Sequence, residues 1–277
     1  MKPSGQPTGS DALAPFEQAL RDRVPSREAL LAEAKAQTRR QRQRKQALAG
    51  TLSALVLAAG VWFLDPSFYS DDLRVAIGGR ERLELADGSQ LVLDSATHLR
   101  IEHRLRSRQF ELLQGEATFT VAHAPQPFIV RSQGVAVRDI GTVFNLRSDS
   151  RGVAVAVVEG EVEVSSATLA PKRLHAGQQV LASEQRAGPV MPVDPLRVTS
   201  WQQGKLRFDG TPLREVIIDL QRYRQAPIRL ADPQLGQLRV SGEFDSDAVE
   251  SLLDLLPSIL PISVSRAGDG SVSITGR

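Results

Sequence analysis

Residues 82–94 read RLELADGSQLVLD, and two runs of alternating apolar and polar residues flank the pair Asp87-Gly88. Alternation with a period of two is typical of a β-strand that buries one face. An Asp-Gly pair between two such runs favours a tight turn, because glycine adopts the positive φ angles that hairpin turns require. The stretch therefore predicts a β-hairpin.

The same alternation extends over residues 75–185, where almost no helical periodicity interrupts it. Turn signals divide this region into short runs of strand length. Further pairs of strands are predicted in three segments: 108–122 around Gly115, 153–166 around Glu159-Gly160, and 174–183. We therefore expect an all-β domain of stacked hairpins over residues 68–186, built as a sandwich or a solenoid.

Residues 187–198, AGPVMPVDPLRV, hold three prolines and a glycine and predict a linker. Beyond them, residues 199–277 change rhythm, with helical spacing in TPLREVIIDLQRYRQ and in DSDAVESLLDLLPSI. The predicted order is β-α-β-β-α-β-β, closed by a hairpin around Asp269-Gly270. This order indicates a small α/β domain with its helices on one face of the sheet.

A segment of eighteen residues without a charge, Ala47–Leu64, predicts a membrane-spanning helix. Five positive charges precede it in residues 39–45, RRQRQRK. The positive-inside rule then places the N-terminus in the cytoplasm and the residues after 65 on the exported side. A cleaved signal peptide fits less well, because the end of the segment offers no small-x-small cleavage site. We expect an uncleaved anchor whose basic run sets topology first and contacts membrane lipid second.

Residues 1–46, before the span, contain two predicted amphipathic helices, of which the second runs into the membrane. Their largest apolar residues are Phe16, Leu20, Leu30 and Leu31. Two such short helices bury little apolar surface by themselves, so this pattern favours contact with a partner. The alternative is a plain anchor tail, because apolar stripes are common on helices.

Charge and motifs exclude several classes of function. Lys and Arg number 34 against 32 Asp and Glu, which gives a formal net charge of +2 and argues against a dedicated nucleic-acid binder. The chain has no cysteine and its four histidines are scattered, so we expect no metal site and no cofactor. No phosphate loop, HExxH or GxSxG occurs, and nothing indicates an enzyme that acts on a separate substrate.

Several blocks of the all-β segment resemble, in order, those of the FecR domain: ADGSQLVLDSATHLRI, LLQGEATFTVAHAPQPFIVRS, VRDIGTVFNLRS, VVEGEVEVSS and LHAGQQV. The later stretch WQQGKLRFDGTPLREVIIDLQRY, with VSGEFDSD, is similar to the secretin/TonB short N-terminal (STN-like) domain that ends such proteins. The resemblance covers roughly residues 68–277 together with the single span.

This resemblance implies a function. FecR-like proteins are inner-membrane transducers of cell-surface signalling in Gram-negative bacteria, with periplasmic C-terminal domains. By similarity, the exported domains contact the signalling domain of a TonB-dependent outer-membrane receptor, and the cytoplasmic tail binds an extracytoplasmic-function sigma factor. The usual trigger is uptake of an iron source, after which site-specific proteases release the cytoplasmic piece. The alternative is a structural adaptor that docks a receptor or secretin without regulating a sigma factor.

The resemblance also implies the contact residues. On the tail, we expect Phe16, Leu20, Leu30 and Leu31 to contact the sigma factor. On the exported side, the strand LRVSGEF, residues 238–244, is a candidate edge for the receptor, with Leu238, Val240 and Phe244 as its apolar residues.

The pair Gly141-Thr142, within RDIGTVFNL, has two interpretations. From the residues alone it is a turn that opens a strand, because glycine permits a tight turn and threonine suits a strand. The resemblance adds a second, since some FecR-like proteins cut themselves at a Gly-Thr bond in this block. Thr142 would attack the Gly141 carbonyl, and Asp139 and Asn145 are the nearby polar side chains that could assist.

Overall fold

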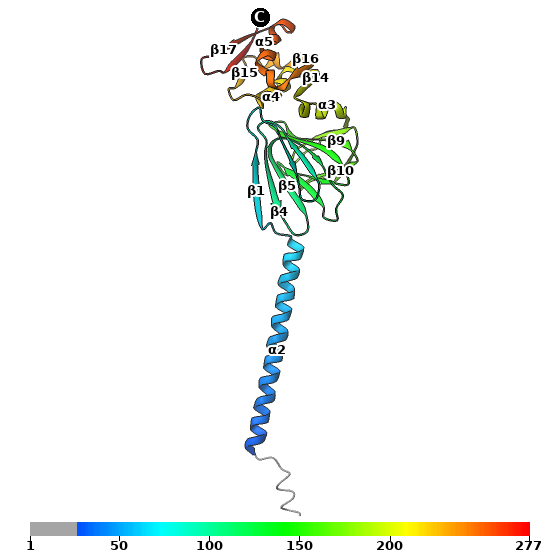
Figure 1. Ribbon diagram of the computed structural model, residues 1–277, viewed down its shortest axis with the longest axis vertical. Helices are drawn as coiled ribbons and strands as arrows, with labels where there is room; N and C mark the ends of the chain where they lie inside the picture. The colour runs from blue at the N-terminus through cyan, green and yellow to red at the C-terminus, as the bar shows by residue number, and fades with distance from the viewer. Residues whose placement is uncertain (1–26) are drawn as a thin grey trace, which may run out of the picture. The chain divides into compact units, whose positions relative to one another are not determined.

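The structure, a computed structural model, describes residues 27–277 of the chain (Figure 1). The chain divides into two units, residues 1–64 and residues 65–277. The first unit contains α2 (Arg27–Leu64), a helix that runs without a break through 38 residues. The predicted tail helix and the predicted span at 47–64 are therefore parts of one helix.

The last part of α2, Thr38–Leu64, is 27 residues long and apolar enough to cross a membrane. At 1.5 Å per residue this segment extends over roughly 40 Å, which exceeds the hydrocarbon thickness of about 30 Å. Its large apolar side chains are exposed, among them Leu57 and Phe63. Within residues 27–277 this is the one candidate membrane-spanning helix, as the sequence predicted.

The second unit begins with a β-domain, which we define as residues 65–192. Within the described residues it contains thirteen strands connected by hydrogen bonds. They are β1 (Tyr69–Arg74), β2 (Glu81–Glu84), β3 (Gln90–Leu93), β4 (His98–His103), β5 (Arg108–Thr120), β6 (Phe128–Ser132), β7 (Val135–Asp139), β8 (Val143–Asp149), β9 (Gly152–Glu159), β10 (Glu161–Ser166), β11 (Lys172–His175), β12 (Gln178–Ala182) and β13 (Met191–Pro192).

These strands form two layers that share β5. One layer has the order β1-β4-β5-β6-β7-β10-β11, and the other has the order β2-β3-β5-β8-β9-β12-β13. Since β5 continues from one layer into the other, the whole is a single sheet curled into a half barrel (Figure 1).

The core of the β-domain lies between its two layers. Phe119 and Phe144 stack with ring centroids 5.0 Å apart, and Phe110 stacks on Phe128 at 4.5 Å. All four rings are buried. The alternating apolar residues that predicted strands thus supply the facing side chains of the two layers.

Of the four hairpins predicted in the β-domain, one is a hairpin, and the closing hairpin predicted around Asp269-Gly270 is confirmed, since β17 and β18 pair antiparallel there. β2 and β3 pair antiparallel around Asp87-Gly88, as predicted. The prediction for 108–122 is wrong, because β5 passes through Gly115 as one strand of 13 residues. Gly115 has φ +95°, and a Cβ atom there would lie 2.4 Å from the Thr97 hydroxyl. The glycine therefore bends a strand between two layers where a turn was expected.

The predictions for 153–166 and 174–183 are wrong for a related reason. β9 pairs with β8 and β12, whereas β10 pairs with β7 and β11, so the chain changes layer at Gly160. It changes layer again at Gly177, between β11 and β12. Both glycines have positive φ, as in a hairpin turn, but the strands that they connect lie in different layers.

We expect Gly160→Ala to destabilise the protein more than Gly78→Ala. Their φ angles are nearly equal, +78° and +77°, so backbone strain alone costs about 1 kcal/mol at either site. A Cβ at Gly160 would also lie 2.1 Å from the Gly141 carbonyl oxygen, whereas one at Gly78 meets open space. We therefore expect a loss of about 3 kcal/mol or more for Gly160→Ala. Chemical denaturation of the full chain in detergent micelles measures both, and equal losses would contradict the packing argument.

The second unit ends with a C-terminal domain, which we define as residues 193–277. Its helices and strands are α3 (Pro195–Thr199), β14 (Lys205–Pro212), α4 (Leu213–Gln221), β15 (Ile228–Leu230), β16 (Arg239–Asp245), α5 (Val249–Ile259), β17 (Ile262–Arg266) and β18 (Val272–Gly276). Three 3-10 turns accompany them: η1 (Ser200–Gln203), η2 (Pro233–Gln237) and η3 (Ser246–Ala248). Residues 187–198, predicted as a linker, contain β13 and the start of α3.

The strands of the C-terminal domain form two small sheets, so the predicted single sheet is wrong. β14 pairs with β16 through a bulge between Phe208 and Thr211, and the short β15 pairs in parallel with β18, which also pairs with β17. Apolar residues of α4 and α5, such as Leu220 and Leu253, share one buried core with Val240 of β16. From β14 to β18 the elements follow the predicted order β-α-β-β-α-β-β.

Candidate functional site

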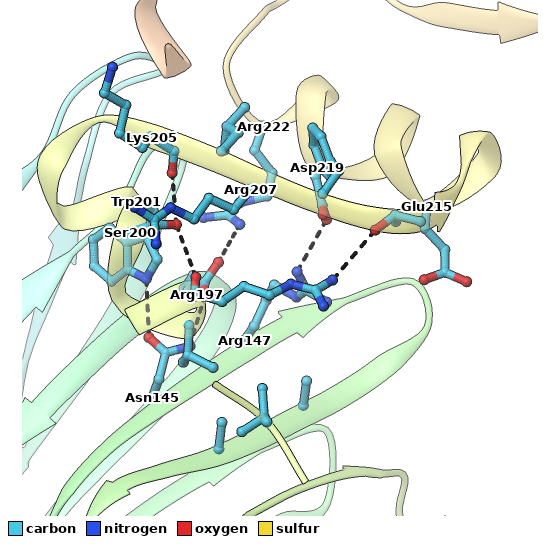
Figure 2. Close-up of a pocket in the computed structure, with 18 of the residues that line it drawn as sticks. Asn145, Arg147, Arg197, Ser200, Trp201, Lys205, Arg207, Glu215, Asp219 and Arg222 are labelled. Carbon is cyan, nitrogen blue, oxygen red and sulfur yellow. Dashed lines mark hydrogen bonds and ion pairs between the residues drawn. The ribbon is translucent and has the colours of Figure 1, made fainter. Parts of the chain in front are cut away.

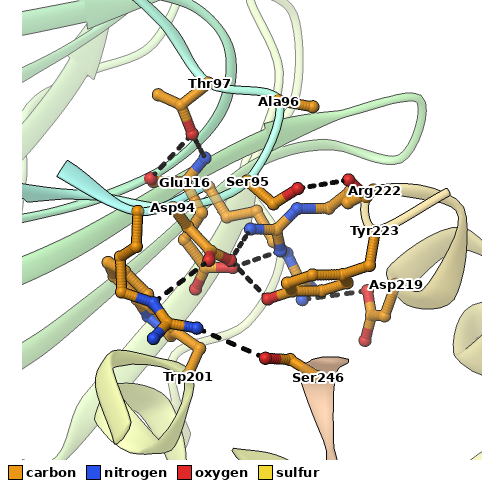
Figure 3. A network of polar contacts seen from close by, with 12 residues as sticks. Asp94, Ser95, Ala96, Thr97, Glu116, Trp201, Asp219, Arg222, Tyr223 and Ser246 are labelled. Atoms are coloured by element: carbon orange, nitrogen blue, oxygen red, sulfur yellow. Dashed lines mark hydrogen bonds and ion pairs between the residues drawn. The ribbon is translucent and has the colours of Figure 1, made fainter. Parts of the chain in front are cut away.

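The β-domain and the C-terminal domain meet at a junction built around Arg222 (Figure 3). Arg222 follows the last residue of α4, whose apolar face is fixed in the C-terminal core. Its guanidinium donates to Glu116 Oε2 at 2.5 Å and to the carboxylate of Asp94. The hydroxyl of Tyr223 also donates to Asp94, at 2.5 Å. We call Asp94, Glu116, Arg222 and Tyr223 the Arg222 cluster.

The two carboxylates of the Arg222 cluster are held in place by the β-domain. Glu116 follows the bend of β5 directly, and its main-chain N–H donates to the Thr97 hydroxyl at 3.1 Å. Asp94 follows β3 and is fully buried. Both acidic side chains thus lie inside the protein, where an ionised carboxylate needs a counter-charge.

Burial and the ion pairs set the protonation states of the Arg222 cluster. Burial disfavours the charged form of Arg222, but the attraction of Glu116 and Asp94 outweighs it and raises the pKa of the guanidinium above its ordinary value. Desolvation raises the pKa of Asp94, and Arg222 opposes this shift. Burial also raises the pKa of Tyr223, which keeps the phenol protonated as a donor.

A second group of charges joins α4 to the turn between β8 and β9 (Figure 2). Arg151 donates to Asp149 at 2.5 Å and to Asp219 of α4 at 2.9 Å, and Arg147 reaches Asp219 at 3.2 Å. We call Arg147, Asp149, Arg151 and Asp219 the Arg151 cluster. Since Asp219 lies in α4 and Arg222 directly follows it, two sets of ion pairs fix this helix to the β-domain.

Asn145 and Trp201 close the junction between the two clusters (Figure 2). The indole N–H of Trp201 donates to Asn145 Oδ1 at 3.2 Å, and the amide of Asn145 donates to Glu116 Oε1 at 2.8 Å. A cavity of about 160 Å³ remains here, and residues of both clusters line it together with Arg197: Glu116, Arg222 and Tyr223 from the first cluster, and Arg147, Arg151 and Asp219 from the second. Asn145 was predicted as a nearby side chain that could assist Thr142, but its side chain is engaged in the hydrogen bonds of the junction.

The Gly141–Thr142 bond lies in the crossover from β7 to β8. Gly141 has φ +96°, and Thr142 is buried. The Thr142 hydroxyl donates to the carboxylate of Asp139, which also accepts from the Gly141 N–H at 3.1 Å. Asp139 is thus positioned to accept the proton of the Thr142 hydroxyl, which is the nucleophile that self-cleavage would require.

The predicted receptor strand is β16, whose hydrogen-bonded partner is β14. Its apolar side chains point into the core: Val240 is 1% exposed, and Leu238 and Phe244 are partly buried against the same cluster. These three side chains are therefore occupied within the C-terminal domain. The surface that remains for a partner is the backbone edge of β16 and its polar face.

Two of the four predicted sigma-factor contacts lie outside the residues that the structure describes. Phe16 and Leu20 are outside residues 27–277. Leu30 and Leu31 are on α2, and the side chain of Leu31 is exposed.

Comparison with known proteins places this architecture in a family. The model of the FecR protein matches residues 71–163, and the model of the FecR C-terminal region matches residues 205–274. The chain belongs to the FecR family. The two matched segments of this FecR protein meet at the junction, since the first contains Asp94 and Glu116 and the second contains Arg222.

Two crystal structures resemble this FecR protein with a TM-score of 0.66 and 28% sequence identity. Both are of a candidate anti-sigma factor from Parabacteroides distasonis, at 2.50 and 1.65 Å resolution. The matches cover 76% and 75% of this chain and 100% and 99% of those chains. A comparison with curated proteins finds no match.

Sequence reasoning did not predict the junction of this FecR protein. Asp94 and Arg222 are 128 residues apart in the sequence. From its neighbours alone, a charged residue next to a strand or after a helix is expected to be exposed to solvent. One usable signal was the pair Gly115-Glu116, a glycine followed by a carboxylate in an apolar run. A charge in such a run indicates a buried partner elsewhere in the chain.

We expect Arg222→Met to lower the free energy of unfolding by about 3–5 kcal/mol, because Glu116 stays buried without its arginine and Asp94 keeps only the longer ion pair with Arg80, at 3.8 Å. Adding Asp94→Asn and Glu116→Gln to this variant should recover part of the loss. Denaturation of the full chain, followed by Trp201 fluorescence in a Trp62→Phe background, measures the change at the junction. As a matched control, Arg266→Met removes an exposed arginine with two acidic partners and should leave the unfolding midpoint nearly unchanged. Equal effects of the two single variants would contradict this role of Arg222.

Proposed function

We propose that this FecR protein is a single-pass inner-membrane regulator of an extracytoplasmic-function sigma factor. The observation that carries the proposal is the arrangement of the chain: one candidate span, followed by the two FecR segments in order. The likeness to a candidate anti-sigma factor over 76% of the chain supports the same role. In this proposal residues 1–46 bind the sigma factor.

The orientation in this proposal rests on charge. Five positive residues at 39–45 precede the apolar segment, and Asp65, Asp71 and Asp72 follow it. The positive-inside rule therefore favours a cytoplasmic N-terminus and periplasmic FecR domains. A cytoplasmic tail meets a sigma factor, and a periplasmic domain meets an outer-membrane receptor. We propose that the receptor is TonB-dependent and that its cargo is an iron source.

The tail test uses Phe16→Asp with Leu20→Asp in the full chain. Burial of these side chains against the sigma factor would contribute roughly 1.5–3 kcal/mol each, so charges there should abolish co-purification with a co-expressed sigma factor. Gln18→Asp, on the same predicted helix, is the control and should retain binding. Undiminished binding of the double variant would refute the proposed face. A wild-type chain that binds no sigma factor would instead favour the structural adaptor.

We propose that the receptor's signalling domain binds the C-terminal domain along the edge of β16. A strand edge with one partner can accept a further strand through main-chain hydrogen bonds. Hydrogen–deuterium exchange on the full chain should then show new protection of amides in 238–244 when the signalling domain is added. The edge strand β17 provides an internal control that should not change. Protection confined to residues 69–192 would place the receptor contact on the β-domain and contradict this proposal.

We propose that the chain cuts itself once at Gly141–Thr142. The Thr142 oxygen attacks the Gly141 carbonyl carbon, and its proton passes to the Asp139 carboxylate. The C–N bond then breaks, the departing amine takes the proton, and water hydrolyses the resulting ester. The products are a Gly141 carboxylate and a Thr142 amine with its hydroxyl restored. The hydrogen bond from Thr142 to Asp139 and the positive φ of Gly141 support this chemistry.

Intact mass of the purified full chain tests self-cleavage. We expect two fragments divided at this bond, which stay associated because β7 pairs with β10 and β8 pairs with β5 across the cut. Thr142→Ala should remain one chain, Thr142→Ser should still be cut, and Asp139→Asn should be cut more slowly. An uncut wild-type chain would refute the proposal, and unchanged cleavage in Thr142→Ala would indicate an external protease.

A further inference from the structure

The end of the β-domain that follows the candidate span is fixed to one loop. Asp65, the residue after Leu64, accepts hydrogen bonds from the Arg106 N–H at 2.9 Å and from the Ser107 hydroxyl at 2.6 Å. Arg104 donates to the main-chain oxygen of Asp65 at 2.5 Å. The hydrogen bond from Ser107 also holds the pKa of Asp65 below its ordinary value, so the carboxylate stays ionised as an acceptor. The loop between β4 and β5 is therefore tied to the first residue of the β-domain.

This loop and the start of β1 expose large apolar side chains. Phe68, Tyr69 and Leu105 are 58%, 60% and 58% exposed. Phe68 and Tyr69 are both joined to His103, because the Phe68 N–H donates to the His103 carbonyl at 3.0 Å and the Tyr69 ring stacks on the His103 ring at 3.9 Å, and Leu105 follows two residues after His103. We call Phe68, Tyr69 and Leu105 the basal patch.

Chain geometry places the basal patch close to the bilayer. Consecutive Cα atoms are about 3.8 Å apart, so Asp65 cannot lie farther than this from the last residue of the span. Residues hydrogen-bonded to Asp65, and their neighbours, then lie within roughly 10–15 Å of that point. The headgroup region on each side of the hydrocarbon core is about 5–8 Å thick. The loop therefore lies at the depth of the headgroups or directly above them.

We propose that the basal patch inserts into the interface of the phospholipid bilayer and holds the β-domain against the membrane. Aromatic and large aliphatic side chains at a membrane surface are stabilised by burial at the boundary between headgroups and acyl chains. Tyr69 has an apolar ring and a polar hydroxyl, which suits this boundary. We choose the bilayer as the binding partner of the basal patch because the patch follows the candidate span within a few residues. Whenever the span is inserted, the bilayer is therefore within reach of the patch.

The chain contains no cysteine, so single labels can be introduced directly. We would attach a nitroxide to Leu105→Cys in the full chain, reconstituted in nanodiscs of phosphatidylcholine and phosphatidylglycerol. Oxygen concentrates in lipid and a nickel chelate in water, so the label at 105 should collide more with oxygen than with nickel. Ile77→Cys, another exposed apolar position but on the side of Ser95 and the junction, should show the reverse. Val56→Cys in α2 reports whether the span itself is inserted.

A label at 105 that behaves like the label at 77 would overturn the proposal. Shielding from both oxygen and nickel would also overturn it, because this result means contact with protein. The change Phe68→Ser should shift the label at 105 toward nickel without lowering the unfolding midpoint, since this side chain is exposed. If the label at 56 is not in lipid, the span is absent and the proposal fails with it.

Discussion

The bend of β5 at Gly115 is the constraint on which the second unit depends. A side chain at this position would overlap Thr97, and the positive φ of Gly115 turns one strand of 13 residues from the first layer into the second. Both layers pair with this strand, so the curvature of the whole sheet follows from it. The bend also fixes the next residue, Glu116, at the buried junction where Arg222 pairs with it. One glycine thus determines both the shape of the β-domain and the place where the C-terminal domain attaches.

The C-terminal domain is attached to the β-domain through buried charged side chains. Burying Asp94, Glu116 and Arg222 costs desolvation free energy that their attraction largely offsets, so the net gain in stability is small. An apolar contact of the same size would hold the two domains with less dependence on orientation. Ion pairs with fixed geometry instead accept few relative positions of α4 and β5. The junction therefore specifies how the two FecR segments are oriented more than it strengthens their association.

The sequence predicted the elements of this fold better than their pairing. The alternation of apolar and polar residues predicted the strands, because it shows which side chains are buried. It also predicted the hairpin at Asp87-Gly88 correctly, because the two strands that pair there are consecutive in the sequence. Gly115 and Gly160 carry the same local turn signal, yet one bends a strand and the other connects two layers. A positive φ reports a change of direction and does not report the partner of the next strand. The junction was beyond local reasoning for the same reason, since its carboxylates and Arg222 come from distant parts of the chain.

The two ends of the β-domain are set apart by β5. Gly115, at its middle, lies beside the junction, whereas its two ends lie together, because Arg108 donates to the main-chain oxygen of Ala122 at 3.1 Å. Arg108 pairs with His103 of β4, next to the loop that holds Asp65, and the Val121 N–H donates to Thr142. The Gly141–Thr142 bond and Asp65 are therefore at the end of the β-domain that is remote from the junction. The C-terminal domain attaches at the opposite end, where Arg222 pairs with Glu116 and the Tyr223 hydroxyl donates to Asp94, so these buried contacts join it to the β-domain directly beside the bend of β5.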